Sequence, residues 1–255
     1  MNRRVMRYLL ALGIAALAVS VAAQGRRFGR DPVQFETNVP YDGRFTFARI
    51  RYTPLNDLEG FDRGDRKWDH DYPRAERNFM KILSEITLLQ PYLEGGNVFA
   101  ADDPELMKFP IAYLSEPGFW TMTEPEELAL RAYLAKGGFL IIDDFVGQHW
   151  YNFEAQISKL LPEARLIRLD TSDAIFDSFY RIESLAFAHP NFRVESEFWG
   201  VFEDNDRSKR LQIIVNYNND IGDYWEWSDE GFLPIDLTNE AYKLGVNYVM
   251  YAFTH

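Results

Sequence analysis

The chain has 255 residues, of which 47% are hydrophobic and 26% charged, which is enough for one large α/β domain with a sizeable core. Its net charge of −12 argues against nonspecific binding to nucleic acid, because a phosphate backbone requires a basic face. The sequence contains no cysteine, which excludes disulfides, thiolate metal sites and a cysteine nucleophile.

The N-terminus has the features of an export signal. Three arginines among the first seven residues precede an uncharged, mostly apolar stretch at 8–22, and small residues lead up to Ala23. This pattern predicts a signal peptide over residues 1–23, cleaved after Ala23, and hence a periplasmic or secreted protein. The apolar stretch of about 15 residues is short of the roughly 20 that cross a bilayer. An uncleaved N-terminal membrane anchor is the alternative, and only then would the protein contact a membrane.

Residues 24–44 are rich in glycine, arginine, proline and asparagine, which predicts a linker ahead of a domain at 45–255. The domain begins with a strand expected at 45–52, where aromatic and β-branched residues gather. A polar loop at 56–71 follows, and ordered loops of this length often carry function.

A helix is predicted over 73–89. Pro73 suits a first helical position, and apolar residues then recur at helical spacing as far as Leu89. Two further strands are expected at 97–100 and 109–115.

The strongest local signal is a capping box, in which Thr123 and Glu126 satisfy backbone groups at the start of a helix. The helix is expected to end at Lys136, and the run at 139–145 then reads as a central strand buried on both faces. The short helix between two strands predicts a parallel, right-handed crossover.

The remaining elements complete an α/β pattern with a β-hairpin extension in the C-terminal part. They are expected as a helix at 153–161, a strand at 165–169, two strands at 200–203 and 211–217 around a charged turn, a loop at 218–234 and a helix at 239–253.

Four motifs in order along the chain resemble the DUF4159 family. They are FARIRY at 47–52, Trp68 with DYPRAE at 71–76, GGF at 137–139 with Asp143 and Asp144, and LGVN at 244–247. The resemblance covers residues 45–255. It implies a flavodoxin-like three-layer α/β sandwich with a mainly parallel sheet, similar to class I glutamine amidotransferases and to ThuA-like proteins. It implies no activity, since amidotransferases carry a cysteine nucleophile on the turn after a central strand, where this chain has the two aspartates.

The candidate site residues follow strands, at the edge where ligands gather in open α/β sheets. Asp143 and Asp144 end the central strand, and Glu116 follows the strand at 109–115. Carboxylates there are costly unless paired or bound to a cation, so these three are candidate ligands of a divalent cation or catalytic acids and bases. His149 is a further candidate acid or base.

Three arginines, Arg49, Arg51 and Arg74, are candidates for binding an anionic ligand, because guanidinium groups suit carboxylate and phosphate. The competing interpretation, which we favour for the arginines, is that they form salt bridges with Asp143, Asp144 or Glu76.

Five tryptophans fall in expected loops and are candidates for stacking on a sugar ring: Trp68, Trp120, Trp150, Trp225 and Trp227. The alternative, which we favour, is that these rings pack the long loops onto the sheet, since large aromatic side chains are usually buried.

Two hypotheses for function follow. The first is an exported, non-enzymatic module that binds a partner protein or a glycan ligand, favoured because no complete catalytic constellation is visible. The second is a hydrolase-like enzyme acting on a carbohydrate-type substrate through its carboxylates. A divalent cation is the one cofactor that the residues suggest, since no histidine pair has the spacing of a zinc site and no glycine-rich phosphate loop occurs.

Overall fold

The computed structural model describes residues 35–55 and 65–255. The chain divides into one unit at 1–35 and a second at 36–255, and the fold given below is that of the second. The predicted signal peptide, its cleavage site and the alternative membrane anchor lie outside the described residues. No helix within the described ranges combines the length and apolar character that crossing a membrane requires.

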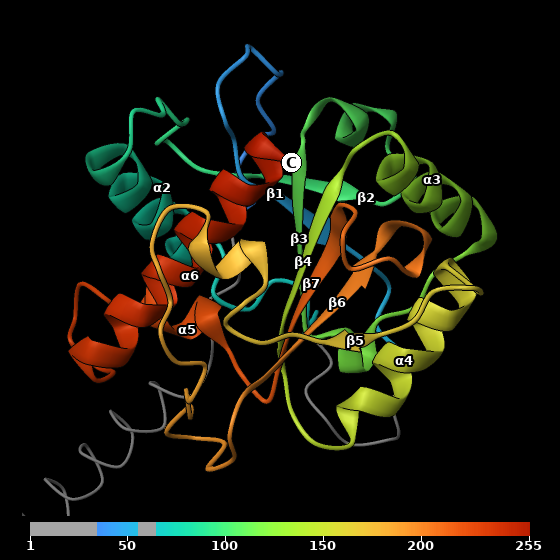
Figure 1. Ribbon diagram of the computed structural model, residues 1–255. Coiled ribbons are helices and arrows are strands. Elements are labelled where there is room, and N and C mark those ends of the chain that lie inside the picture. The colour runs from blue at the N-terminus through green and yellow to red at the C-terminus, as the bar shows by residue number, and fades with distance from the viewer. Residues whose placement is uncertain (1–34, 56–64) are drawn as a thin grey trace, which may run out of the picture. The chain divides into compact units, whose positions relative to one another are not determined.

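Within the described residues, seven strands form one mostly parallel sheet in the order β2-β1-β3-β4-β7-β6-β5 (Figure 1). The strands are β1 (Ala48–Arg51), β2 (Asn97–Ala100), β3 (Ile111–Ser115), β4 (Phe139–Phe145), β5 (Ile167–Arg168), β6 (Glu197–Phe202) and β7 (Leu211–Tyr217). The strands β2, β1, β3, β4 and β7 run parallel to one another. The pairs β6–β7 and β5–β6 are antiparallel.

Helices cover both faces of this sheet (Figure 1). In the described part of the chain they are α2 (Arg74–Ile86), α3 (Glu124–Ala135), α4 (His149–Leu160), α5 (Ile221–Glu226) and α6 (Ile235–Thr254). Along β4, Phe139 and Ile141 pack with α2, α5 and α6, whereas Leu140 and Ile142 pack with α3 and α4. The alternation of side chains along a strand therefore builds two cores.

The local signals predicted the centre of the fold best. The predicted central strand is confirmed and spans Phe139–Phe145, and Thr123 and Glu126 form the predicted capping box at the start of α3. The helix predicted over 73–89 ends at Ile86, because Thr87 leaves the helical conformation and its hydroxyl donates to the carbonyl of Leu83.

Two features of the C-terminal part differ from the expected pattern. The stretch expected as a loop at 218–234 contains α5, whose first turn is capped by Asp220 accepting from the backbone of Asp223. A six-residue helix is too short to reveal helical periodicity in the sequence. The strands expected around the charged turn, β6 and β7, are neighbours within the main sheet, where β7 lies between β4 and β6.

A fully buried ion pair joins β1 to α2. Arg49 Nε lies 2.6 Å from Glu76 Oε1, and the Arg49 guanidinium also donates to the carbonyl of Trp68 and lies 4.8 Å from the ring centre of Tyr113. Burial by itself lowers the pKa of Arg49, but the charge of Glu76, together with the smaller effects of Tyr113 and Asp71 and the hydrogen bond to Glu76, raises it above its ordinary value. Burial raises the pKa of Glu76, against the charge of Arg49 and its hydrogen bond. The pair ties together the strand, the helix and the loop before the helix.

We expect Glu76→Gln to destabilise the protein by about 3–5 kcal/mol, because it leaves a buried guanidinium without its countercharge. Urea unfolding followed by circular dichroism measures this change. The control is Lys108→Met, which breaks the exposed pair with Glu105 and should cost no more than about 1 kcal/mol. An equally small loss for Glu76→Gln would contradict the role given to the pair.

Candidate functional site

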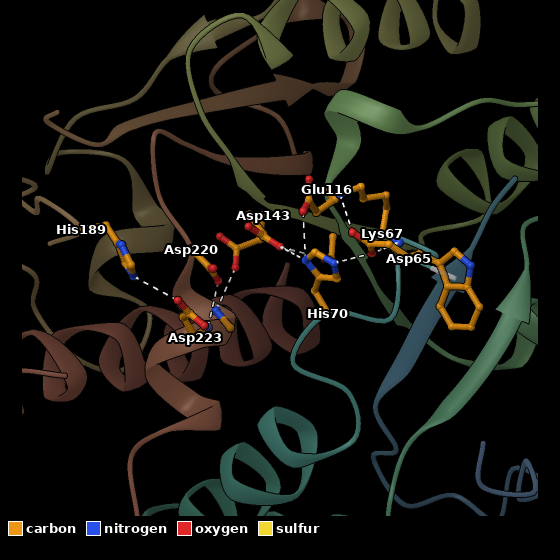
Figure 2. A network of polar contacts seen from close by, with 12 residues as sticks. Asp65, Lys67, His70, Glu116, Asp143, His189, Asp220 and Asp223 are labelled. Carbon is orange, nitrogen blue, oxygen red and sulfur yellow. Dashed lines mark hydrogen bonds and ion pairs between the residues drawn. The ribbon is translucent and has the colours of Figure 1, made fainter. Parts of the chain in front are cut away.

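Acidic side chains converge where the parallel strands end (Figure 2). Asp71 precedes α2, Glu116 follows β3, Asp143 and Asp144 end β4, and Asp220 and Asp223 follow β7. These six residues are called the carboxylate cluster below. All but Asp223 are buried. The carboxyl ends of parallel strands meet at one edge, so residues far apart in the sequence become neighbours there.

Asp143 faces the helices of the α2 side. One of its oxygens, Oδ2, accepts hydrogen bonds from the Tyr113 hydroxyl at 2.8 Å and from the backbone of Gly222 at 3.0 Å. Its other oxygen, Oδ1, has no hydrogen-bond partner within the described ranges. Burial raises the pKa of Asp143 to about 6, against the opposing effect of these hydrogen bonds.

Asp144 reaches the site through a break in strand geometry. Its φ is 63°, and the register between β4 and β7 shifts between Ile142 and Phe145. Its Oδ2 accepts from the Ser115 hydroxyl at 3.3 Å and lies 3.7 Å from His70 Nδ1. The side chains therefore do not simply alternate between the two faces at this end of β4. Both aspartates lie at the carboxyl edge of the sheet.

His70 lies between carboxylates on both sides (Figure 2). Its Nε2 is 2.8 Å from Asp65 Oδ1, and its Nδ1 is 2.9 Å from Glu116 Oε1. Asp65 also accepts from Lys67 at 2.7 Å. Burial raises the pKa of Asp65, but the hydrogen bonds from Lys67 and His70 outweigh it and hold the pKa below its ordinary value. The charged Asp65 thus orients the imidazole toward Glu116 and Asp144.

Among the described residues, four overlapping sets of side chains could hold a metal ion, each with ligand atoms within 4.8 Å of one another. The sets are His70, Glu116 and Asp144; Asp71, Asp144 and Asp220; Asp71, Asp223 and Glu226; and His189, Asp220 and Asp223. Asp144 belongs to two of them. The carboxylate oxygens of these sets can therefore coordinate cations, and His70 adds an imidazole nitrogen to the first set.

His189 is suited to donate a proton rather than to bind a metal. The backbone of Asn191 donates to its Nδ1 at 3.3 Å, so in the neutral ring the proton is on Nε2, which lies 3.5 Å from Asp223 Oδ2. Burial lowers the pKa of His189, against the charge of Asp223. A histidine that binds a metal usually donates through its other nitrogen, which is the reverse of this arrangement.

Burial and repulsion between neighbouring carboxylates raise the pKa values inside the cluster. Burial, with the charge of Glu116 next in size, raises the pKa of Asp144 to about 8. Burial together with the charge of Asp144 raises the pKa values of Asp71 and Asp220 well above the ordinary value. Buried groups with such shifts are common at functional sites.

The backbone is strained at the same places. Asp71, Glu116 and Asp144 have φ values of 64°, 52° and 63°, in the left-handed region that residues other than glycine rarely adopt. The Tyr52 hydroxyl donates to the carbonyls of both Ser115 and Glu116 and so holds one of these turns. Strain that is held in place in this way is typical of functional sites.

The structure brings together three of the four residues predicted from strand ends: Asp143, Asp144 and Glu116. The fourth, His149, packs against the Phe119 ring at 4.9 Å and belongs to none of the metal-binding sets. Burial lowers the pKa of His149, with the charge of Glu116 opposing.

Sequence reasoning missed Asp71, Asp220 and His70 as members of the site. Asp220 and its neighbour Asp223 stand in a polar stretch directly after a strand, which is the same signal that identified Glu116. His70 and Asp71 precede a helix and carry no comparable signal.

The candidate arginines do not form the predicted salt bridges with Asp143 and Asp144. Arg49 pairs with Glu76, Arg74 pairs with Asp229 and Glu230, and Arg51 is exposed at the end of β1. The interpretation in which arginines neutralise the two aspartates therefore does not hold, whereas the predicted pairing of an arginine with Glu76 is confirmed.

The tryptophans pack loops onto the sheet. Trp120 is 0% exposed and Trp68 is 7% exposed, both within the core on the α3 and α4 side. Trp150 is half-buried among aromatic side chains of the same core, including Phe145 and Tyr217. The prediction of Trp120 as a ligand-binding residue thus has to be corrected, because a fully buried ring presents no face to a sugar.

A protein-family model described as "Domain of unknown function (DUF4159)" matches residues 46–253. The match includes every residue of the carboxylate cluster and confirms the resemblance to that family. No curated protein matches the chain.

The crowding of carboxyls predicts how stability depends on pH. Without a bound cation, the unfolded chain releases the Asp144 proton near pH 4 and the folded protein near pH 8, so the free energy of unfolding should fall as the pH rises from about 4 to about 8. Asp143 adds a decline of the same sign up to about pH 6. Urea unfolding with a chelator across this range measures the slope.

In that experiment Asp144→Asn should flatten the decline, because the amide does not titrate. Asp102→Asn, at an exposed position, should leave the slope unchanged. A wild-type stability that is constant or rises with pH over the same range would contradict the prediction.

Proposed function

The chain belongs to the DUF4159 family, a family defined by a domain of unknown function, and we propose from its own geometry that it is a divalent-cation-binding module. The cation would lie at the carboxyl edge of the sheet, with His70, Glu116 and Asp144 as its ligands. Bound there, it would present open coordination positions to an anionic group of a ligand or partner.

The arrangement of His70 carries this proposal. Its Nδ1 lies 2.9 Å from Glu116 and 3.7 Å from Asp144, while its Nε2 is held at 2.8 Å by Asp65. An imidazole that donates one N–H to a carboxylate and turns its other nitrogen toward further carboxylates is the usual arrangement of a metal-binding histidine. In the absence of a cation, the same geometry requires a proton on each ring nitrogen.

The donor set suggests the kind of ion. Carboxylate oxygens suit Mg²⁺, Ca²⁺ and Mn²⁺, and an added imidazole nitrogen favours a transition ion such as Mn²⁺ over the first two. The side chains of His70, Glu116 and Asp144 are 17%, 11% and 11% exposed, so an ion among them would remain reachable from solvent. Water or a ligand oxygen could complete its coordination shell.

The strand order supports the finer fold assignment. The parallel strands follow the order β2-β1-β3-β4-β7, which is the flavodoxin-like order 2-1-3-4-5 if β7 counts as the fifth parallel strand. This order agrees with a class I glutamine-amidotransferase-like or ThuA-like architecture. Since the chain has no cysteine, amidotransferase chemistry would lack its nucleophile. The export predicted from residues 1–23 would place the module in the periplasm or outside the cell.

A cation-dependent hydrolase is the second candidate, favoured by Asp143. This carboxyl has one oxygen without a partner in the described part of the chain, and burial raises its pKa to about 6, which suits a general base near neutral pH. A bound cation could supply an activated water. A carbohydrate-type substrate has less support, because Trp120 is buried and cannot stack on it.

Thermal unfolding tests the cation directly. We expect Mn²⁺ at a hundredfold excess over its dissociation constant to stabilise the protein by about 2.7 kcal/mol relative to chelator, because it binds only the folded state. Glu116→Gln and His70→Gln should each remove most of this stabilisation.

The matched control is Glu105→Gln, which alters an exposed carboxylate outside the cluster and should retain the full Mn²⁺ response. An unfolding temperature that is the same with chelator and with Mn²⁺, Mg²⁺ or Ca²⁺ would refute the proposed module. Hydrolysis of a test ester that depends on Mn²⁺ and is lost in Asp143→Asn would favour the second candidate.

A further inference from the structure

We propose that the carboxylate cluster holds a second divalent cation, bound by Asp71, Asp144 and Asp220, so that Asp144 bridges two ions. The inference rests on the proposed function, since the first ion, at His70, Glu116 and Asp144, is the other partner of the bridging carboxylate. The second position suits a hard cation such as Mg²⁺, Ca²⁺ or Mn²⁺, because its three protein ligands are all carboxylates.

The geometry fits a single ion. Asp71, Asp144 and Asp220 are all buried, and their ligand atoms lie within 4.8 Å of one another. Oxygens that coordinate one Ca²⁺ at about 2.3–2.6 Å can be at most about 5 Å apart. An ion at the centre of the three oxygens therefore requires little rearrangement, and the smaller Mg²⁺ or Mn²⁺ would draw them closer.

An independent observation comes from Asp71. The residue is only 4% exposed, and its Oδ2 has no hydrogen-bond partner in the part of the chain that the structure describes. This oxygen lies 2.5 Å from the position that a Cβ on Gly222 would occupy, so it is directed toward the start of α5, beside Asp220. A buried carboxylate oxygen without a partner is costly, and a cation would satisfy it.

Protons alone account for the cluster less well. A proton neutralises one carboxyl and joins at most two of them, whereas one ion can be coordinated by Asp71, Asp144 and Asp220 together. A second divalent ion would also neutralise the carboxylates of Asp71 and Asp220, which are not ligands of the first ion. Arg49, the buried cation beneath this region, already pairs with Glu76.

The two positions differ in chemistry. The first includes an imidazole nitrogen and is partly open to solvent, whereas the second has only buried oxygens. Two ions that share a carboxylate lie about 3.5–4 Å apart and can bind both oxygens of one oxyanion. This pairing would make a phosphate- or carboxylate-type group the natural ligand of the open side.

The test is the number of Mn²⁺ ions bound per chain, measured by metal analysis at saturation, with electron paramagnetic resonance to detect coupling between neighbouring ions. We expect about two coupled ions in the wild-type protein and one uncoupled ion in Asp71→Asn. Gly222→Ala should have the same effect without a change of charge, because its Cβ would meet Asp71 Oδ2 at 2.5 Å. It serves as the second variant if Asp71→Asn fails to fold, which circular dichroism would reveal.

The outcomes separate this inference from the proposed function. A wild-type protein that binds one ion overturns the pair of ions. Loss of that ion in Glu116→Gln places it at the first position and leaves the proposed function intact, whereas loss only in Asp71→Asn places it at the second position and overturns the ligand set of the proposed function. A wild-type protein that binds none overturns both. Asp102→Asn is the control for the general loss of a carboxylate and should bind Mn²⁺ as the wild type does.

Discussion

The ion pair between Arg49 and Glu76 is the constraint on which the site geometry depends. It is fully buried, and it joins a four-residue strand to the first turn of α2. The same guanidinium donates to the carbonyl of Trp68, two residues before His70 and three before Asp71. A rigid, charged link inside the core thus sets the position of a loop whose side chains reach the edge of the sheet. Such a pair contributes specificity of arrangement more than net stability, since its desolvation is costly.

The carboxylate cluster lowers the stability that the core provides. Several acidic side chains are buried together, and their pKa values are raised because burial and mutual repulsion both disfavour the charged form. The charge of Arg49 opposes the rise at Asp71, but the pKa of Asp71 stays well above its ordinary value, so the cluster sacrifices stability in the cation-free state. A bound cation reverses the sign of these interactions, so binding and stability become linked. This linkage is the physical reason for interpreting the cluster as a binding site rather than as part of the scaffold.

The architecture determines where a ligand can bind, and the side chains determine the chemistry at that place. The parallel strands and their order place ligands at the carboxyl edge, as in other open α/β sheets. The turn after the central strand carries Asp143 and Asp144, so this edge offers oxygen ligands and proton acceptors rather than a sulfur nucleophile. Aromatic side chains fill the space behind it, with Trp150 packed between Phe153 and Trp199. A fold of this kind can therefore host a function that its general architecture does not indicate.

Local patterns in the sequence determined the α/β class, the central strand at 139–145, the capped helix before it, and the acidic ends of two strands. These features depend on neighbouring residues: a run of apolar side chains, a capping box, a carboxylate directly after a strand. Only the tertiary structure decided that His70, Asp71 and Asp220 join Asp144, because these residues come from three separate connections. Their meeting depends on β7 lying beside β4, and on left-handed backbone at Asp71 and Asp144 that no local pattern required. The burial of Trp120 was decided in the same way, since the hydrophobic effect acts on the space that packed elements leave, and that space is set by their order in the sheet.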